Sequence, residues 1–257
     1  MVDMINELDG KVAIVTGSAR NIGRVTAEEL ARAGAALVIN SVQAKELCEE
    51  VVEGILSSGG KAIPFMADVR DPDAVNAMAA AAVKEFGGID ILIHNAAVRN
   101  NTSFEDMDFE TFSTTVDISI YGMFHLAKAV IPSMKERDGG VIVGVGGMSS
   151  TRGTRTRSHT MAAKMGLNAL VRGLALDLAP YNIRANQVVV GTYDTVRENN
   201  PSSAPRAALN LSANTIPLGR LGIPQDMADL IRFVVGPGAA YITGQTIHSN
   251  GGAFLNL

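Results

Sequence analysis

Short runs of apolar residues alternate with longer helical patterns along almost the whole chain, and this alternation limits the possible folds most strongly. The runs are nearly continuous in apolar character, which is typical of parallel strands covered on both faces. We expect strands at Val12–Thr16, Ala36–Asn40, Ala62–Phe65, Ile89–Ile93, Val141–Val145, Arg184–Val189 and Thr246–Ser249. The helical stretches between them include Ile22–Ala33, Ala44–Ser58, Asp73–Phe86, Phe109–Lys135 and Ser158–Ala179. This alternation predicts an α/β fold, a doubly wound parallel sheet of about seven strands with helices on both faces.

The domain organisation follows from length and regularity. A chain of 257 residues, 47% of them hydrophobic, can form one large core. No linker, repeat or low-complexity segment interrupts it, so we expect residues 1–257 to form a single domain. The least regular stretch is Gly191–Pro217, which is polar and contains proline. Because it follows the carboxyl end of a strand, where such sheets bind ligands, it is a candidate substrate lid.

Charge and cysteine content exclude several classes of function. The formal net charge of −4 argues against binding to nucleic acid or to an anionic membrane. The chain has no apolar stretch long enough for a transmembrane helix, and its acidic start does not resemble a signal peptide. The single cysteine, Cys48, cannot form an internal disulfide and lies in a charged helical pattern, so we expect a structural or neutral role for it. These features suit a cytoplasmic protein without a metal site.

A glycine-rich turn follows the first predicted strand. It reads Thr16-Gly17-Ser18-Ala19-Arg20-Asn21-Ile22-Gly23 and leads into a helix. Glycines at such a turn let the backbone approach a pyrophosphate, which then binds at the helix N-terminus. The context of strand, turn and helix makes a Rossmann-type dinucleotide site the favoured interpretation over a merely tight turn.

The turn resembles the Thr-Gly-x-x-x-Gly-x-Gly motif of the short-chain dehydrogenase/reductase superfamily in its single-domain form. Asn21 stands at the middle glycine position, and asparagine is one of the few residues that tolerate a left-handed backbone. Later landmarks of the family follow in order: Asp68-Val69, His94-Asn95-Ala96-Ala97, the loop from Asn186 to Thr195, and Tyr241 to Gln245 with Gly251-Gly252.

This resemblance assigns a set of residues to the cofactor. Asp68 and Val69 match a pair that contacts adenine, and Thr195 matches a threonine in the loop after the sixth strand. The full set is Gly17, Ser18, Arg20, Asn21, Ile22, Gly23, Asn40, Ser41, Asp68, Val69, Asn95, Ala96, Lys164 and Thr195.

The choice of cofactor is argued from charge. An acidic residue after the second strand would bind the ribose 2′-hydroxyl of NAD and repel the 2′-phosphate of NADP. That position holds Ser41, and no acid lies closer than Glu46. Arg20 stands where family members that use NADP often carry a basic residue, and a guanidinium binds phosphate well; the alternative is a solvated surface arginine. We expect NADP(H) in preference to NAD(H).

The catalytic positions depart from the family pattern. The family uses Asn, Ser, Tyr and Lys, with the last two spaced Tyr-x-x-x-Lys on one helix face. Here Lys164 matches, but Thr160 takes the tyrosine position, Gly147 the serine position and Ser119 the asparagine position. Threonine is far less acidic than tyrosine, so we expect little ordinary carbonyl reductase activity. Lys164, Thr160 and Ser119 are the candidate catalytic residues.

Other side chains are alternatives for the missing groups. Ser149 and Ser150 follow Gly147 closely and would supply a hydroxyl if the loop is rearranged. His159 is one candidate, although it should face away from Thr160 on the helix, and Tyr193 and Tyr121 are candidate proton donors from new directions. His94 is expected to be a packed, hydrogen-bonded residue beside the cofactor.

Three arginines, Arg152, Arg155 and Arg157, lie in the loop after the fifth strand. In the resembled fold this loop forms one wall of the substrate cleft. The guanidiniums would suit a carboxylate or phosphate ligand. A solvated loop or a contact between subunits is an equal alternative.

Three functions are compatible with these observations. The first is an NADP(H)-dependent oxidoreductase with a rebuilt proton relay that acts on a small carbonyl compound or alcohol. If the three arginines bind the substrate, that compound is also anionic. The second is a lyase, hydratase or isomerase on the same scaffold, and the third is a non-catalytic nucleotide-binding protein. Halohydrin dehalogenases show the opposite pattern, since they keep the Ser/Tyr pair and lose the nucleotide turn. The resemblance also implies a homo-oligomer, a tetramer built partly from the helices at Phe109–Lys135 and Ser158–Ala179.

Overall fold

The computed structural model describes residues 6–195 and 213–255, and its centre is one seven-stranded parallel sheet. The order of the strands is β3-β2-β1-β4-β5-β6-β7. Their bounds are β1 Val12–Val15, β2 Ala36–Ser41, β3 Lys61–Met66, β4 Ile91–His94, β5 Gly140–Gly147, β6 Ile183–Val190 and β7 Thr246–Ser249. The predicted Rossmann-type fold is confirmed, and each predicted strand end is within two residues of the observed one.

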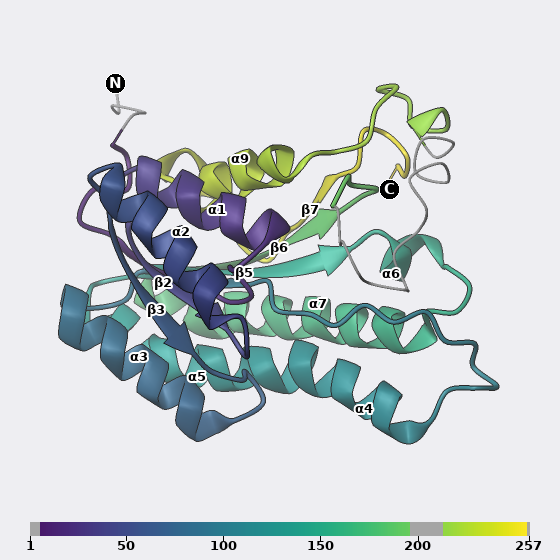
Figure 1. The fold of residues 1–257 in the computed structure, drawn as a ribbon, viewed down its shortest axis with the longest axis horizontal. Coiled ribbons are helices and arrows are strands. Elements are labelled where there is room, and N and C mark those ends of the chain that lie inside the picture. Colours follow the sequence, from purple (N-terminus) through teal and green to yellow (C-terminus); the bar gives the residue numbers. More distant parts are fainter. Residues whose placement is uncertain (1–5, 196–212, 256–257) are drawn as a thin grey trace.

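Helices cover both faces of the sheet. In Figure 1, α1, α2 and α9 lie on one side, and α3, α4, α5 and α7 lie on the other. The main helices are α1 Asn21–Arg32, α2 Lys45–Ser57, α3 Pro72–Phe86, α4 Phe109–Val116, α5 Gly122–Glu136, α6 Ser149–Arg152, α7 Ser158–Leu178 and α9 Pro224–Val235. Short 3-10 turns follow α7 at Ala179–Tyr181 and α9 at Pro237–Ala239. No helix of the described residues is both long and apolar enough to cross a bilayer.

The single helix predicted at Phe109–Lys135 is interrupted. A π-helical turn, Asp117–Tyr121, joins α4 to α5, so the prediction of one regular helix was wrong at this point. A π turn inserts an extra residue without changing the apolar pattern enough to reveal it, and such turns are frequent at functional sites. Helix α9 was not among the predicted helices. It begins with Pro224, and Asp226 accepts a hydrogen bond from the backbone N–H of Ile223 at 2.8 Å.

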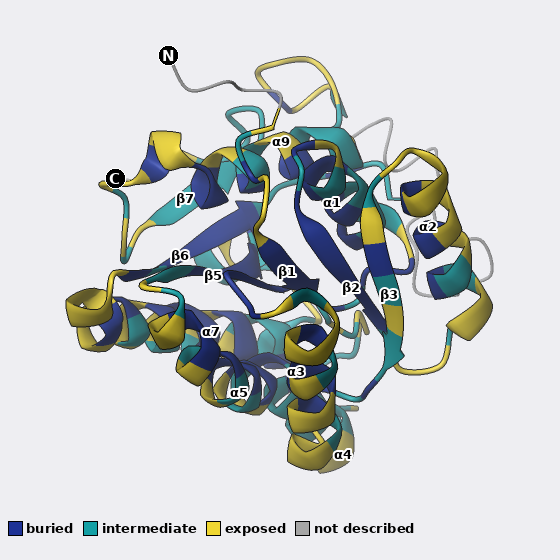
Figure 2. Ribbon diagram, turned by 90° about the vertical axis from the view of Figure 1, so that its left-hand side faces the viewer, coloured by how far each residue is buried: buried dark blue, intermediate teal, exposed yellow. Residues whose placement is uncertain are grey.

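The interior consists of two apolar layers, one on each face of the sheet. Alternate residues of the strands point to opposite faces, so Val15 and Ile39 enter one layer, and Ile14 and Val38 enter the other. Figure 2 shows the inner strands buried between the helical layers. Cys48 is buried in the first layer, and burial raises the pKa of its thiol to about 11. Its role is therefore that of a small apolar side chain.

The strand order creates a crevice at the carboxyl ends of β1 and β4. Chain connections leave these two adjacent strands in opposite directions, which is the topological switch point where open α/β sheets bind ligands. The glycine-rich turn follows β1, and Asn95 follows β4. Both predicted parts of the cofactor site therefore meet at this edge.

Candidate functional site

The backbone of the glycine-rich turn adopts the conformations that its residues permit. Gly17 has φ +63° and Asn21 has φ +49°, so asparagine occupies the left-handed region as predicted. A Cβ on Gly23 would lie 2.2 Å from the Gly17 carbonyl oxygen, which only glycine avoids. Arg20 precedes α1 without a side-chain cap, and the first turn of α1 has no acidic residue. The free N–H groups of α1 can therefore receive an anion.

Two buried polar side chains fix the turn against the sheet. Ser18 Oγ donates to the Val15 carbonyl at 2.7 Å and accepts from the Asn40 N–H at 2.8 Å. Asn40 Nδ2 donates to the carbonyls of Phe65 and Ala67, at 3.1 and 3.0 Å. Its amide thus ties β2 to the end of β3. Ser18 and Asn40 thus shape the turn through buried side chains.

Three residues predicted to lie around the adenosine end of the cofactor, Arg20, Ser41 and Asp68, are more exposed than Ser18 and Asn40. Ser41 Oγ accepts from the Ala44 N–H at 3.2 Å, and the Arg20 side chain is exposed at the turn. Asp68 is held by Arg70, whose Nε lies 3.0 Å and Nη2 2.6 Å from Oδ2. This hydrogen bonding lowers the pKa of the Asp68 carboxyl. Val69 is buried, and a Cβ on Gly122 would approach its side chain to 2.8 Å.

Thr16 connects the turn to the end of β4. Its Oγ1 accepts from the N–H groups of Asn95 and Ala96, both at 3.1 Å. Asn95 Nδ2 donates in return to the carbonyls of Thr16 and Gly17, at 3.1 and 3.0 Å. The two halves of the crevice are thus joined by a reciprocal set of hydrogen bonds. Ile22 lies partly buried at the start of α1.

His94 is packed and hydrogen-bonded, as expected. It is fully buried, with Nε2 3.0 Å from the Ile118 carbonyl and Nδ1 3.3 Å from Thr16 Oγ1. Burial and the nearby charge of Lys164 lower its pKa to about 3, so the ring is neutral at pH 7. A carbonyl only accepts, so Nε2 carries the proton. His94 therefore links the glycine-rich turn to the π turn that contains Ser119.

The four positions of the family's catalytic set lie on β5, α7 and the π turn. Lys164 is only 7% exposed, and its Nζ donates to the Val145 carbonyl at 2.8 Å. Burial lowers its pKa to about 8. Thr160 lies one helical turn earlier on α7 and is half-buried, while Ser119 is buried in the π turn. Gly147 ends β5.

The two serines that follow Gly147 differ in what their hydroxyl groups contact. A Cβ on Gly147 would meet only Ser149 Oγ, at 3.8 Å. Ser149 therefore places its hydroxyl next to the position that a serine side chain at 147 would occupy. Ser150 Oγ donates to the Gly147 carbonyl at 2.6 Å and is already engaged.

The other candidate proton donors are less well placed. Tyr193 is buried, and its hydroxyl is 2.6 Å from Ser249 Oγ near the C-terminal strand. Burial raises the pKa of Tyr193, which makes it a poorer acid. Tyr121 is 55% exposed at the end of the π turn. His159 is fully buried, and burial lowers its pKa.

A buried amide pair supports α7 beneath the site. Gln187 Nε2 donates to the Lys164 carbonyl at 3.3 Å, and Asn168 Nδ2 donates to Gln187 Oε1 at 2.7 Å. Asn168 Nδ2 also donates to Thr246 Oγ1 at 2.6 Å. The helix that presents Thr160 and Lys164 is thus hydrogen-bonded to β6 and β7.

The predicted lid is only partly described. Residues 191–195 and 213–217 are within the described ranges, and residues 196–212 lie outside them. Thr195 is the last described residue before that gap, and its Oγ1 accepts from Arg99 Nη1 at 3.5 Å. Sequence reasoning did not single out Arg99. Its place after β4, in a loop that borders the crevice, was the available signal.

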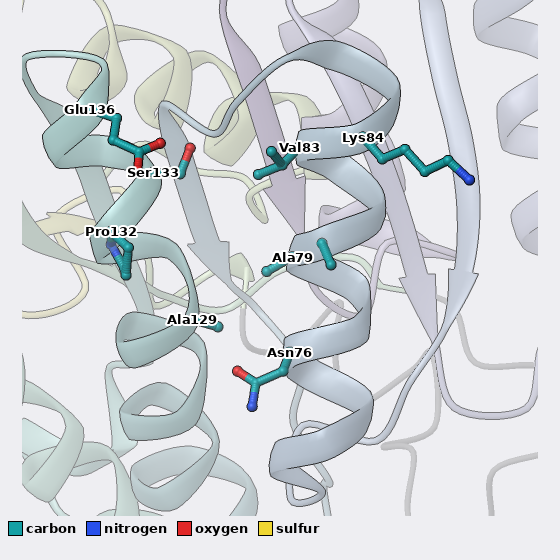
Figure 3. A pocket seen from close by; sticks show the side chains of 9 residues that line it. Asn76, Ala79, Val83, Lys84, Ala129, Pro132, Ser133 and Glu136 are labelled. Carbon is teal, nitrogen blue, oxygen red and sulfur yellow. The ribbon is translucent and has the colours of Figure 1, made fainter.

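A groove of about 430 Å³ lies away from these residues, between α3 and α5. Figure 3 shows Asn76, Val83, Ala129 and Glu136 around it. It contains none of the predicted site residues, so we do not connect it with the chemistry at the crevice.

Comparison with known proteins identifies the family. Residues 17–253 match a family model described as enoyl-(acyl carrier protein) reductase. The chain is 37% identical over 251 residues to an L-rhamnose 1-dehydrogenase (NAD(P)(+)) of Azotobacter vinelandii, covering 96% of this chain and 98% of the relative. This chain belongs to the short-chain dehydrogenase/reductase superfamily.

Other members of the superfamily match this chain over a similar share of its length and with similar sequence identity. A 3-oxoacyl-[acyl-carrier-protein] reductase of Vibrio cholerae is 33% identical over 248 residues, covering 96% of this chain and 99% of the relative. A solved 7α-hydroxysteroid dehydrogenase, complexed with NADH and 7-oxo-glycochenodeoxycholic acid, matches with a TM-score of 0.89, 30% identity and 100% coverage of both chains. A dehydrogenase/reductase from Sinorhizobium meliloti matches with a TM-score of 0.89, 32% identity and 98% coverage of both. The superfamily, and with it an oxidoreductase of this type, is thus established by sequence and by structure.

Proposed function

We propose that this chain is an NADP(H)-dependent oxidoreductase that reduces a small carbonyl compound or oxidises the corresponding alcohol, with an atypical active site. The observation that carries the proposal is the placement of Lys164, a buried amine at the carboxyl end of β5, one turn after Thr160. The names of the relatives describe dehydrogenases and reductases, which supports redox chemistry. We also propose that residues 1–257 act as one cytoplasmic domain in which 191–217, with 196–212 outside the described residues, serves as the substrate lid.

The residues at the switch point fit a dinucleotide. Gly17 and Gly23 leave space that a Cβ would fill, and the uncapped N-terminus of α1 suits a pyrophosphate. Asn95 and Ala96 are held at the inner end by Thr16. When bound, the nicotinamide supplies or takes the hydride. The side chains of Ser18 and Asn40 support the turn from behind rather than contact the cofactor.

The proposed proton relay uses Lys164 and Thr160. A pKa of about 8 leaves Lys164 mostly protonated at pH 7 but able to give up its proton. Thr160, on the same face of α7, carries the proton from the ammonium to the substrate oxygen through its hydroxyl or a bound water. Ser149 Oγ, beside the position of a side chain at Gly147, hydrogen-bonds the same oxygen. Ser119, buried in the π turn, has no part in this relay.

The cofactor preference gives the first prediction. We expect NADP(H) to bind more tightly than NAD(H), and Arg20→Ala to weaken NADP(H) by about 10-fold or more because a charge-assisted hydrogen bond is lost. Titration calorimetry with both cofactors measures it. Arg172→Ala, on an exposed face of α7, is the matched control and should change neither affinity. Equal affinities for the two cofactors, or a loss with NAD(H) as large as with NADP(H), would contradict it.

A homotetramer is the assembly we propose. Phe109, Tyr121, Phe124 and Met165 are large apolar side chains that are exposed on α4, the π turn, α5 and α7. Exposed apolar side chains on neighbouring helices are typical of a surface that another subunit covers. These are the helical segments expected from the sequence to form the subunit contact.

A further inference from the structure

The short segment after β6 is attached to the loop that precedes α9. Tyr193 forms a parallel β-bridge with Gly222 of that loop. The Gly222 carbonyl accepts from the Asp194 N–H at 2.8 Å, and the Gly222 N–H donates to the Thr192 carbonyl at 3.0 Å. Two backbone hydrogen bonds therefore fix the segment on this side.

The Tyr193 side chain attaches the same segment to the end of β7. Its hydroxyl lies 2.6 Å from Ser249 Oγ, and the Gly191 N–H donates to the Ser249 carbonyl at 3.0 Å. Tyr193 is only 7% exposed, and its ring packs on Gly222, where a Cβ would lie 2.5 Å from the ring atom Cε2. Tyr193 thus joins three segments that are far apart in the sequence.

The Tyr193 ring is not enclosed on every side. A cavity of about 190 Å³ lies beside it and is also lined by Leu218, Arg220 and Asn250. Since no protein atoms fill this space, packing does not hold the ring in that direction. The hydroxyl pair with Ser249 does, and its loss would let the segment shift toward the cavity.

Thr195 depends on Tyr193 for its position. The Thr195 N–H donates to the Tyr193 carbonyl at 3.0 Å, which closes a three-residue turn. Thr195 Oγ1 lies 3.5 Å from Arg99 Nη1 in the loop after β4, so this hydroxyl faces the crevice. The predicted adenosine residues follow β2 and β3, whereas Lys164 contacts the end of β5, the neighbour of β6. Thr195 therefore lies at the same end of the crevice as Lys164.

The Tyr193 side chain and the proposed relay lie on opposite faces of the sheet. Tyr193 packs in the apolar layer that contains Met227 and Ile231 of α9. Helix α7, which bears Lys164, packs in the other layer through Leu167. The Tyr193 hydroxyl, paired with Ser249 on the α9 side, is therefore not placed to donate a proton to the substrate.

We infer that Tyr193 is a positioning residue for the cofactor, which holds Thr195 where its hydroxyl binds the nicotinamide end of NADP(H). The inference rests on the proposed function and deepens it, because it assigns Tyr193 a role at the same crevice. Tyr193 acts through Thr195 and makes no contact of its own with cofactor or substrate.

Calorimetry with two ligands tests this role without turnover. One is NADPH, and the other is 2′-phospho-ADP-ribose, which lacks the nicotinamide. Tyr193→Phe keeps the ring and removes the hydroxyl, so it should weaken NADPH by about 5-fold or more and leave 2′-phospho-ADP-ribose unchanged. Ser249→Ala should do the same, and the double variant should lose no more than either single change, because one contact is broken in each case. Tyr181→Phe, at an exposed tyrosine, is the matched control and should change neither affinity.

Thr195→Ala should weaken NADPH as much as Tyr193→Phe, and the two changes together should cost little more than one. Thermal unfolding shows that each variant is folded, and Ser249→Ala carries the test if Tyr193→Phe does not fold. Three results would overturn the inference: unchanged NADPH affinity in Tyr193→Phe and Ser249→Ala, equal weakening of both ligands, or unchanged NADPH affinity in Thr195→Ala. Failure of both ligands to bind the unmodified protein would instead overturn the proposed function.

Discussion

Ser119→Asn, Gly147→Ser and Thr160→Tyr, introduced together, should raise the rate of NADPH-dependent reduction of simple ketones by about 10²–10⁴-fold. This is the typical contribution of general acid–base catalysis by a well-placed side chain. Tyrosine adds an acid that burial and Lys164 can tune, and serine adds a hydrogen bond to the substrate oxygen. The site leaves room for this serine, since a Cβ on Gly147 has no heavy atom nearer than Ser149 Oγ at 3.8 Å.

The control is the pair Ser119→Asn and Gly147→Ser without the tyrosine. Because catalytic groups act as a unit, the pair should gain far less than the triple variant. NADPH oxidation with a ketone panel measures both, and NADPH affinity shows that the cofactor site is intact. If the unmodified protein already reduces simple ketones at about 1–10³ s⁻¹, the usual enzyme range, our interpretation of these three positions is wrong.

Lys164→Met should abolish turnover and at the same time stabilise the protein at pH 7. The lysine is buried, and its pKa falls from 10.5 to about 8. Charging it in the folded state therefore costs about 3 kcal/mol at pH 7, partly offset by its hydrogen bond to Val145. We expect a net gain of about 1–3 kcal/mol for methionine, measured by denaturant unfolding.

This gain should shrink as the pH rises from about 8 to 10.5. In that range the unfolded protein still binds a proton at Lys164 whereas the folded protein has released it. The unmodified protein therefore becomes more stable relative to the methionine variant as the pH increases. Lys84→Met, at an exposed position, should show neither the gain at pH 7 nor the pH dependence. A loss of stability for Lys164→Met at pH 7 would mean that its hydrogen bond outweighs its desolvation.

The fold and the nucleotide turn were predictable because they depend on local patterns. Apolar runs such as Val12–Val15 that alternate with helical patterns are typical of a parallel sheet covered on both faces, and Gly23 is required by a contact within the turn itself. The left-handed backbone of Asn21 was predictable in the same way, since Asn21 stands at the middle glycine position of the motif and asparagine tolerates this conformation. The π turn at Asp117–Tyr121 was not predictable, because it depends on a hydrogen-bond partner for a backbone carbonyl within the turn. Here the partner is His94, whose Nε2 donates to the Ile118 carbonyl.

Much of the candidate site depends on contacts between distant segments. The sequence could not show that Asn40 turns into the sheet toward Ala67, or that Arg70 engages the Asp68 carboxylate. Nor could it show that Arg99 reaches Thr195 from another loop. The partners of Asn40 and Arg99 lie on a different strand or loop, and the Asp68–Arg70 pair, although local, depends on how its loop folds. Side-chain roles at such an edge follow from tertiary packing rather than from spacing.

The central claim is that this chain transfers hydride from NADPH with Lys164 as the source of the proton. The most direct measurement is a single-turnover experiment with NADPH deuterated at nicotinamide C4 and a panel of 2-oxo acids, followed by mass spectrometry. We predict that deuterium appears on the alcohol carbon of at least one product, and that the rate falls as the pH rises past about 8, where Lys164 loses its proton. Bound NADPH that transfers no deuterium to any of these acids would contradict the claim.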